Sequence, residues 1–121
     1  MHQRINKREL GSDKEKTAAA YLTDNGYRVI ETNYFCKAGE IDIVAKDGEY
    51  LCFIEVKFRN DTSSGYPEEA VDVRKAGRIT RSALFYMNQK GYPENTPCRF
   101  DVVAILGDRI TLYKNAFDAV L

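Results

Sequence analysis

The sequence predicts an α/β fold in which a mixed sheet is flanked by helices. Hydrophobic residues make up 44% of the 121 positions and charged residues 30%, the balance of an ordinary globular protein. Apolar residues recur with helical spacing in two segments and with strand patterns in five others. One helical segment lies between two strands, which indicates a crossover in a mixed sheet. We therefore expect a single domain over residues 1–121, with residues 1–10 flexible.

The two helices are predicted from their end signals and apolar stripes. The first covers residues 12–25, with Ser12 as the N-cap and Gly26 as the stop. The second begins with Pro67 at its first position and ends before Gly91. Its core stripe is expected to contain Val73, Ala76, Gly77, Thr80, Ala83, Leu84 and Met87.

Five segments are predicted as strands because they alternate in polarity or are apolar on both faces. The dipeptides Asp47-Gly48 and Gly107-Asp108 mark turns between consecutive strands. The strands are expected at 27–34, 40–45, 50–58, 99–106 and 109–113. The predicted order is therefore α-β-β-β-α-β-β.

The composition excludes several classes of protein. Eighteen Lys and Arg residues balance eighteen Asp and Glu residues, so nucleic-acid binding would need a local basic patch. The single histidine, His2, lies near the N-terminus, which excludes Ser-His-Asp, Cys-His and HExxH sites. Cys36, Cys52 and Cys98 are too widely spaced for zinc or a disulfide framework, and Cys52 fits a small core position. With neither a long apolar run nor a signal-like N-terminus, we expect a cytoplasmic protein away from membranes.

Acidic side chains occur at positions where these strands would otherwise be apolar. Asp42 shares a strand face with Glu40, and Ile41 and Ile43 are expected together on the other face. Hairpin pairing would bring Asp42 close to Glu55, and two such carboxylates repel each other unless one is protonated. A hard cation removes this conflict, so a Mg²⁺ site is predicted here, with Mn²⁺ as a substitute.

Lys57 follows Glu55 by two residues, so both side chains project from one face about 7 Å apart. A lysine there can hold or deprotonate a water that attacks a phosphate, while a metal polarises the phosphoryl oxygen. The alternative is an exposed ion pair between Glu55 and a neighbouring lysine or arginine. The apolar run over residues 51–58 argues against such an exposed pair.

Two further acidic residues have structural alternatives. Glu15 lies on the apolar stripe of the first helix, where it can face the sheet and serve the metal or its water. It also fits a capping box with Ser12. Asp101 shares a strand face with Arg99, and the two are expected to form a structural pair.

Basic residues could contact phosphate groups in two places. Arg59, just past Lys57, is either a phosphate clamp or a rim residue. One side of the second helix is either a nucleic-acid surface or a solvated face. That side carries Arg74, Lys75, Arg78 and Arg81, and in the nucleic-acid alternative Phe85 would be a stacking partner.

The segments 39–43 (GEIDI) and 53–59 (FIEVKFR) resemble the signature of the bacterial YraN family. Isoleucine stands at position 41, where the motif of the wider PD-(D/E)xK restriction-endonuclease-like superfamily has proline. Archaeal Holliday-junction resolvases are among the closer relatives of that family. The resemblance extends to Glu15, Asn33, 65–67, Lys75 and 99–101.

The resemblance implies a restriction-endonuclease-like α-β-β-β-α-β core and metal-dependent hydrolysis of phosphodiester bonds. By this pattern Asp42 and Glu55 would bind Mg²⁺, Lys57 would position the attacking water, and Glu15 would be an accessory acid. DNA is the expected substrate, including branched or damaged structures, with a homodimer where two strands are cut. The alternative is a nucleic-acid-binding or complex-assembly module with the same fold. A purely structural acidic network would instead make Glu55→Ala destabilising.

Overall fold

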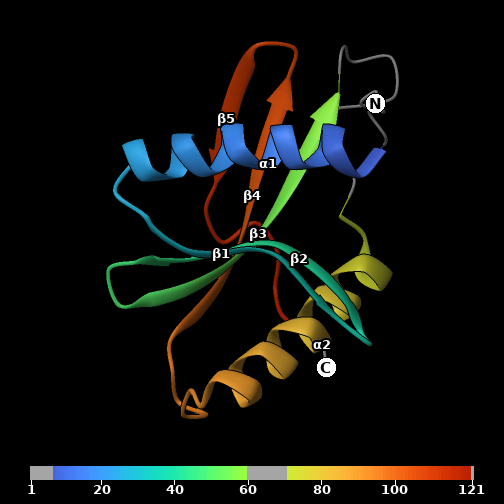
Figure 1. Ribbon diagram of the computed structural model, residues 1–121. Coiled ribbons are helices and arrows are strands. Elements are labelled where there is room, and N and C mark those ends of the chain that lie inside the picture. Colours follow the sequence, from blue (N-terminus) through green and yellow to red (C-terminus); the bar gives the residue numbers. More distant parts are fainter. Residues whose placement is uncertain (1–6, 60–70, 121) are drawn as a thin grey trace, which may run out of the picture.

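The computed structural model, described over residues 7–59 and 71–120, confirms the α/β fold and the α-β-β-β-α-β-β order (Figure 1). Five strands form one sheet in the order β1-β2-β3-β4-β5, and the two helices cover its opposite faces. This arrangement matches the expected restriction-endonuclease-like core. The elements are α1 (Lys7–Asp24), β1 (Arg28–Cys36), β2 (Gly39–Asp47), β3 (Tyr50–Arg59), α2 (Val73–Lys90), β4 (Cys98–Leu106) and β5 (Arg109–Tyr113).

The third strand, β3, is central to the sheet. It pairs with β2 in an antiparallel hairpin and with β4 in parallel, and the remaining pairs are antiparallel. Because parallel neighbours cannot be joined by a tight turn, α2 serves as the crossover between β3 and β4. The sheet is therefore mixed, as predicted.

The first helix begins earlier than the capping pattern predicts. Helical backbone runs from Lys7 to Asp24, so Ser12 lies inside α1 and is not its N-cap. The capping-box interpretation of Glu15 is wrong for the same reason. Residues 7–10 are mainly good helix formers, which explains the extension. The helix ends as predicted, with Gly26 at a positive φ of 92°.

The second helix begins later than predicted. Its first residue is Val73, because the Asp72 side chain caps it by accepting the N–H of Lys75 at 2.9 Å. Pro67, the predicted first position, lies outside the described residues. Gly91 ends the helix in the left-handed conformation that glycine adopts without steric cost. Neither described helix is long and apolar enough to cross a membrane.

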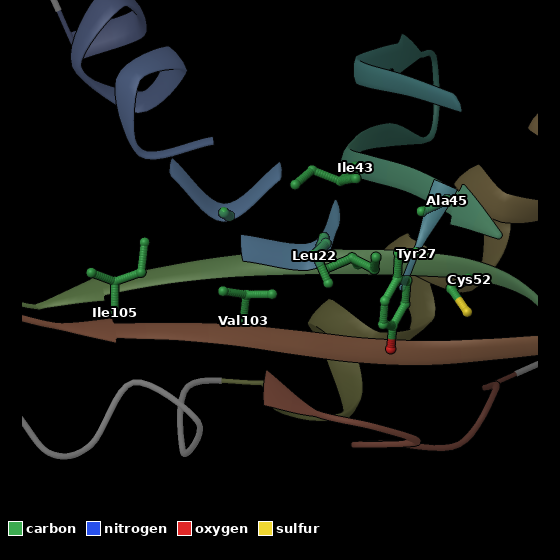
Figure 2. Close-up of a cluster of buried hydrophobic side chains, with 9 residues drawn as sticks. Leu22, Tyr27, Ile43, Ala45, Cys52, Val103 and Ile105 are labelled. Carbon is green, nitrogen blue, oxygen red and sulfur yellow. The ribbon is translucent and has the colours of Figure 1, made fainter. Parts of the chain in front are cut away.

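Apolar clusters fill the space between each helix and the sheet. Figure 2 shows the cluster beneath α1, where Cys52 is a fully buried core residue, as predicted. Two predicted members of the α2 core stripe are wrong, since Val73 is 74% exposed and Leu84 is 52% exposed. The α1 cluster contains Ala18, Leu22, Tyr27, Ile43, Ala45, Cys52, Ile54, Val103 and Ile105. The α2 cluster contains Tyr34, Ile41, Val44, Leu51, Phe53, Ile79, Ala83, Tyr86 and Phe100.

Strand β2 is irregular at Asp42. Ile41 packs in the α2 cluster and Ile43 in the α1 cluster, so the prediction that they share a face is wrong. Pairing of β2 with β3 stops at Ile43 opposite Ile54. Beyond that point the Asp42 carboxylate accepts the N–H of Val56 at 2.8 Å, in place of a strand partner. The two strands therefore separate at Asp42, and this end of the sheet opens.

A buried polar network lies at the other end of β2. The predicted pair is confirmed, with Arg99 Nε 2.9 Å from Asp101 Oδ1. The Tyr27 hydroxyl donates to Asp101 Oδ2 at 2.8 Å, and Arg99 Nη2 donates to Asp47 Oδ2 at 2.8 Å. Burial and the adjacent Asp101 carboxylate raise the pKa of Tyr27. The network joins β4 to β2 and to the start of β1.

Candidate active site

A pocket of about 190 Å³ lies where β2 separates from β3. Gly39 has a positive φ of 149°, and a Cβ there would lie 3.4 Å from Ser82 Oγ of α2. The space would admit a Cβ, so glycine is favoured at the start of β2 by its backbone conformation, which other residues rarely adopt. The pocket is lined by Gly39, Glu40, Asp42, Glu55, Lys75, Arg78 and Ile79.

Three carboxyl groups from α1 and β2 converge beside this pocket. Glu15, Glu40 and Asp42 can each offer one oxygen, and these oxygens lie within 4.8 Å of one another. Glu15 is buried, Asp42 half-buried and Glu40 exposed. Glu15 Oε1 accepts no hydrogen bond from any of the described residues. Several carboxylate oxygens, one of them buried without a donor, suit a hard divalent cation such as Mg²⁺.

The pKa values of Asp42 and Glu15 are both raised, as expected for carboxyl groups that lie close together. Burial, with the nearby Glu55 carboxylate, raises the pKa of Asp42 well above its usual range, although the N–H of Val56 opposes the shift. Burial also raises the pKa of Glu15, against hydrogen bonding with the side chains of Asn33 and Asp42. These carboxyl groups need either a proton or a cation to be stable together.

Glu55 lies in the pocket with Asp42, but it is held by two ammonium groups. Lys57 Nζ is 3.0 Å from Glu55 Oε2, and Lys75 Nζ is 2.5 Å from the same oxygen. Glu55 and Lys57 are each only 8% exposed and lie on the central strand. The alternative ion pair is therefore present, but it is not an exposed pair. Burial, with the neighbouring Lys75 ammonium, lowers the pKa of Lys57.

The predicted phosphate contacts divide into two groups. Lys75 and Arg78 line the pocket with the acids. Arg74 is exposed on α2 and is not among the residues that line it. Arg59 ends β3, where its Nη1 donates to the Phe58 carbonyl oxygen at 2.9 Å. The structure thus places two of these four basic residues directly at the pocket.

Two residues at the acidic cluster, one a member and one a neighbour, had no predicted chemical role. Glu40 lies on the acidic strand face described above, and that alternation was the available signal. Asn33 interrupts β1 with a positive φ of 56°, and its side chain acts on Glu15. Asparagine tolerates this backbone conformation better than most residues, but one asparagine in a strand is a weak signal.

Comparison with known proteins identifies the family. The model of "Uncharacterised protein family UPF0102" matches residues 14–105, which include all the pocket residues. A UPF0102 protein of Lachnoclostridium phytofermentans is 50% identical over 115 residues, covering 95% of this chain and 98% of the relative. A UPF0102 protein of Moorella thermoacetica is 48% identical over 105 residues, covering 87% of each chain. One from Syntrophus aciditrophicus is 44% identical over 122 residues, covering 98% of this chain and 93% of the relative. The resemblance carried by residues 39–43 and 53–59 is thereby confirmed, and the protein belongs to the UPF0102 (YraN) family.

Proposed function

We propose that this protein is a Mg²⁺-dependent nuclease that hydrolyses phosphodiester bonds in DNA. The observation that carries the proposal is the convergence of carboxylates from α1 and β2 beside a pocket that Glu55 of β3 also lines, with Lys57 beside Glu55. When bound, the metal would polarise the phosphoryl oxygen and lower the pKa of the attacking water. A module that only binds nucleic acid has no need to gather so many acids in one place.

The acidic residues would hold the metal from three elements, α1, β2 and β3. Asp42 is oriented by the N–H of Val56, and a cation would replace its hydrogen bonding with the Glu15 side chain. Glu15 approaches from α1 with a buried oxygen that no described donor satisfies. Glu55 and Glu40 complete the acidic lining from β3 and β2. Mn²⁺ is expected to substitute for Mg²⁺ because it accepts the same oxygen ligands.

Lys57 is assigned to the attacking water. Its ammonium is held by Glu55 on the same strand face, and its lowered pKa favours proton transfer. It can therefore orient a water, take its proton, or offset negative charge on the phosphate in the transition state. Lys75 and Arg78 lie at the same pocket, where they can bind the flanking phosphates.

The proposal is tested by cleavage of a substrate panel in Mg²⁺, in Mn²⁺ and in chelator. The panel contains single-stranded, duplex, flapped and four-way-junction DNA, and RNA. We expect metal-dependent cutting of at least one DNA, with branched forms favoured, and none by a folded Asp42→Asn protein. Equal cutting in chelator, or by Asp42→Asn, would contradict the metal-dependent mechanism.

One observation favours a second candidate function. Two lysines already neutralise Glu55 without a metal, as a nucleic-acid-binding or complex-assembly module with the same fold would require. The same panel separates the two candidates. Salt-sensitive binding by a folded protein that cuts none of the substrates would favour the module.

Removing the Lys75 ammonium is expected to tighten metal binding. In Lys75→Met, one of the two cations on Glu55 is lost, so less positive charge opposes a metal at the pocket. Because Lys75 is partly exposed, we expect only about a two- to fivefold fall in the Kd for Mn²⁺. Titration calorimetry measures this Kd without any turnover.

The matched control for this change is Lys90→Met at the other end of α2. Lys90 Nζ lies 3.8 Å from Glu31 Oε1, and neither residue lines the pocket. Its substitution should leave the Kd for Mn²⁺ unchanged. Weaker metal binding by Lys75→Met would mean that Lys75 orients Glu55 for the metal instead of competing with it.

A further inference from the structure

One side of α2 forms a basic stripe that leads away from the pocket. The helix contains five Lys or Arg residues and no Asp or Glu. Arg74, Arg78 and Arg81 are exposed, and their spacing places them on one side of the helix. Phe85 continues the same line one turn beyond Arg81. The stripe consists of Arg74, Arg78, Arg81 and Phe85.

Phe85 is a large apolar residue that α2 leaves partly exposed to solvent. Its side chain is 38% exposed, and Leu84 beside it is 52% exposed. With Arg81 and Asn88, these two residues line a shallow depression of about 330 Å³. Lys37 Nζ lies 5.4 Å from the centre of the Phe85 ring. A flat apolar surface thus has two cations beside it, Lys37 and Arg81, which suits a ligand that is both planar and anionic.

The stripe is continuous with the proposed active site through Arg78, which lines the acidic pocket. Phe85 follows Arg78 by seven residues, about 10 Å along the helix axis. A phosphate backbone that leaves the pocket along the arginines would therefore bring its next bases to Phe85. In a duplex those bases are stacked and paired, so only an unpaired base can cover the ring.

We propose that Phe85 stacks against an unpaired base of a strand whose phosphates contact Arg74, Arg78 and Arg81. The inference rests on the proposed nuclease function and deepens it: the substrate carries a single-stranded segment next to the cleaved phosphate. A second copy of the chain is the other apolar partner to consider. A symmetric contact would bring the arginines of both copies together, and this repulsion favours nucleic acid.

The test is binding in chelator, where no metal-dependent cleavage occurs. Fluorescence anisotropy would follow a short oligothymidylate, a strand of the same length with abasic sites, and a blunt duplex. We expect Phe85→Leu to weaken binding of the oligothymidylate about 5- to 100-fold and to leave the abasic strand unchanged. Phe85→Trp should retain tight binding, because tryptophan preserves an aromatic face.

Two controls separate stacking from charge and from general loss of aromatic surface. Arg78→Gln should weaken binding of all three nucleic acids and lower the salt dependence of binding. Tyr50→Leu removes a comparably exposed aromatic, 39% against 38%, from the far end of β3. It should bind every nucleic acid as the wild type does.

The inference is overturned if Phe85→Leu binds oligothymidylate as tightly as the wild type. It is also overturned if the substitution weakens binding of the abasic strand by the same factor as binding of oligothymidylate. Sedimentation tests the second-copy alternative. A dimer that Phe85→Leu dissociates, with oligothymidylate binding unchanged, would assign the patch to self-association. The cleavage panel is independent of this result. Base-dependent binding without cutting would retain the stacking site and reject the nuclease activity. Cutting without base-dependent binding would retain the nuclease activity and reject the stacking site.

Discussion

Lys57→Met is expected to lower the rate of DNA cleavage about 10²- to 10⁴-fold, the usual contribution of a group that transfers a proton. Methionine occupies a similar volume but lacks the ammonium that lies 3.0 Å from Glu55. Single-turnover rates at saturating Mn²⁺ measure the effect on chemistry separately from metal binding. Lys57→Arg separates the two roles of the lysine, because arginine keeps the charge but cannot act as a base.

The fold should survive Lys57→Met. Glu55 keeps its ion pair with Lys75, so the buried carboxylate is not left without a cation. Lys46→Met is a suitable control, since Lys46 lies at the other end of β2 and its Nζ donates to the Glu49 carbonyl oxygen, away from the pocket. It should cleave at the wild-type rate. Wild-type cleavage by Lys57→Met would remove this residue from the mechanism.

Asp101→Ala is expected to cause the largest loss of stability, about 3–5 kcal/mol in the free energy of unfolding. Asp101 is completely buried and accepts hydrogen bonds from the Tyr27 hydroxyl, Arg99 Nε and the Asn115 N–H. Alanine would leave these donors without their acceptor and would uncover part of the Arg99 charge. Urea denaturation measures the loss from the midpoint at an unchanged m-value.

Asp47→Asn tests a more exposed acid of the same network. Arg99 and Lys114 bind the Asp47 carboxylate and lower its pKa, so its contribution is present above the unfolded pKa and disappears as the pH falls. We expect a loss of about 1 kcal/mol or less at pH 7, which shrinks as the pH falls through the lowered pKa of Asp47. Equal losses for Asp47→Asn and Asp101→Ala at pH 7 would contradict the central role of Asp101.

The fold and the centre of the site could be predicted because their signals are local. Alternating or continuously apolar runs indicate the extent of each strand, and the Asp47-Gly48 turn sets β2 against β3. Glu55 and Lys57 therefore had to share a face, and Asp42 had to lie near them. The first residues of the helices were less predictable, because other residues near Ser12 and Pro67 can also start a helix. Helix formers before Ser12 extend α1 to Lys7, and Asp72 caps α2.

The sequence by itself determined the α/β order, the central strand and the neighbouring positions of Asp42, Glu55 and Lys57. Only the tertiary structure decided that β2 leaves β3 at Asp42, which separates Ile41 from Ile43 and opens the pocket. It likewise decided that Glu15 joins the acids, and that α2 presents Lys75 to Glu55. These contacts join residues that are distant in the sequence, and helix packing on the two faces of the sheet, rather than local periodicity, sets their geometry.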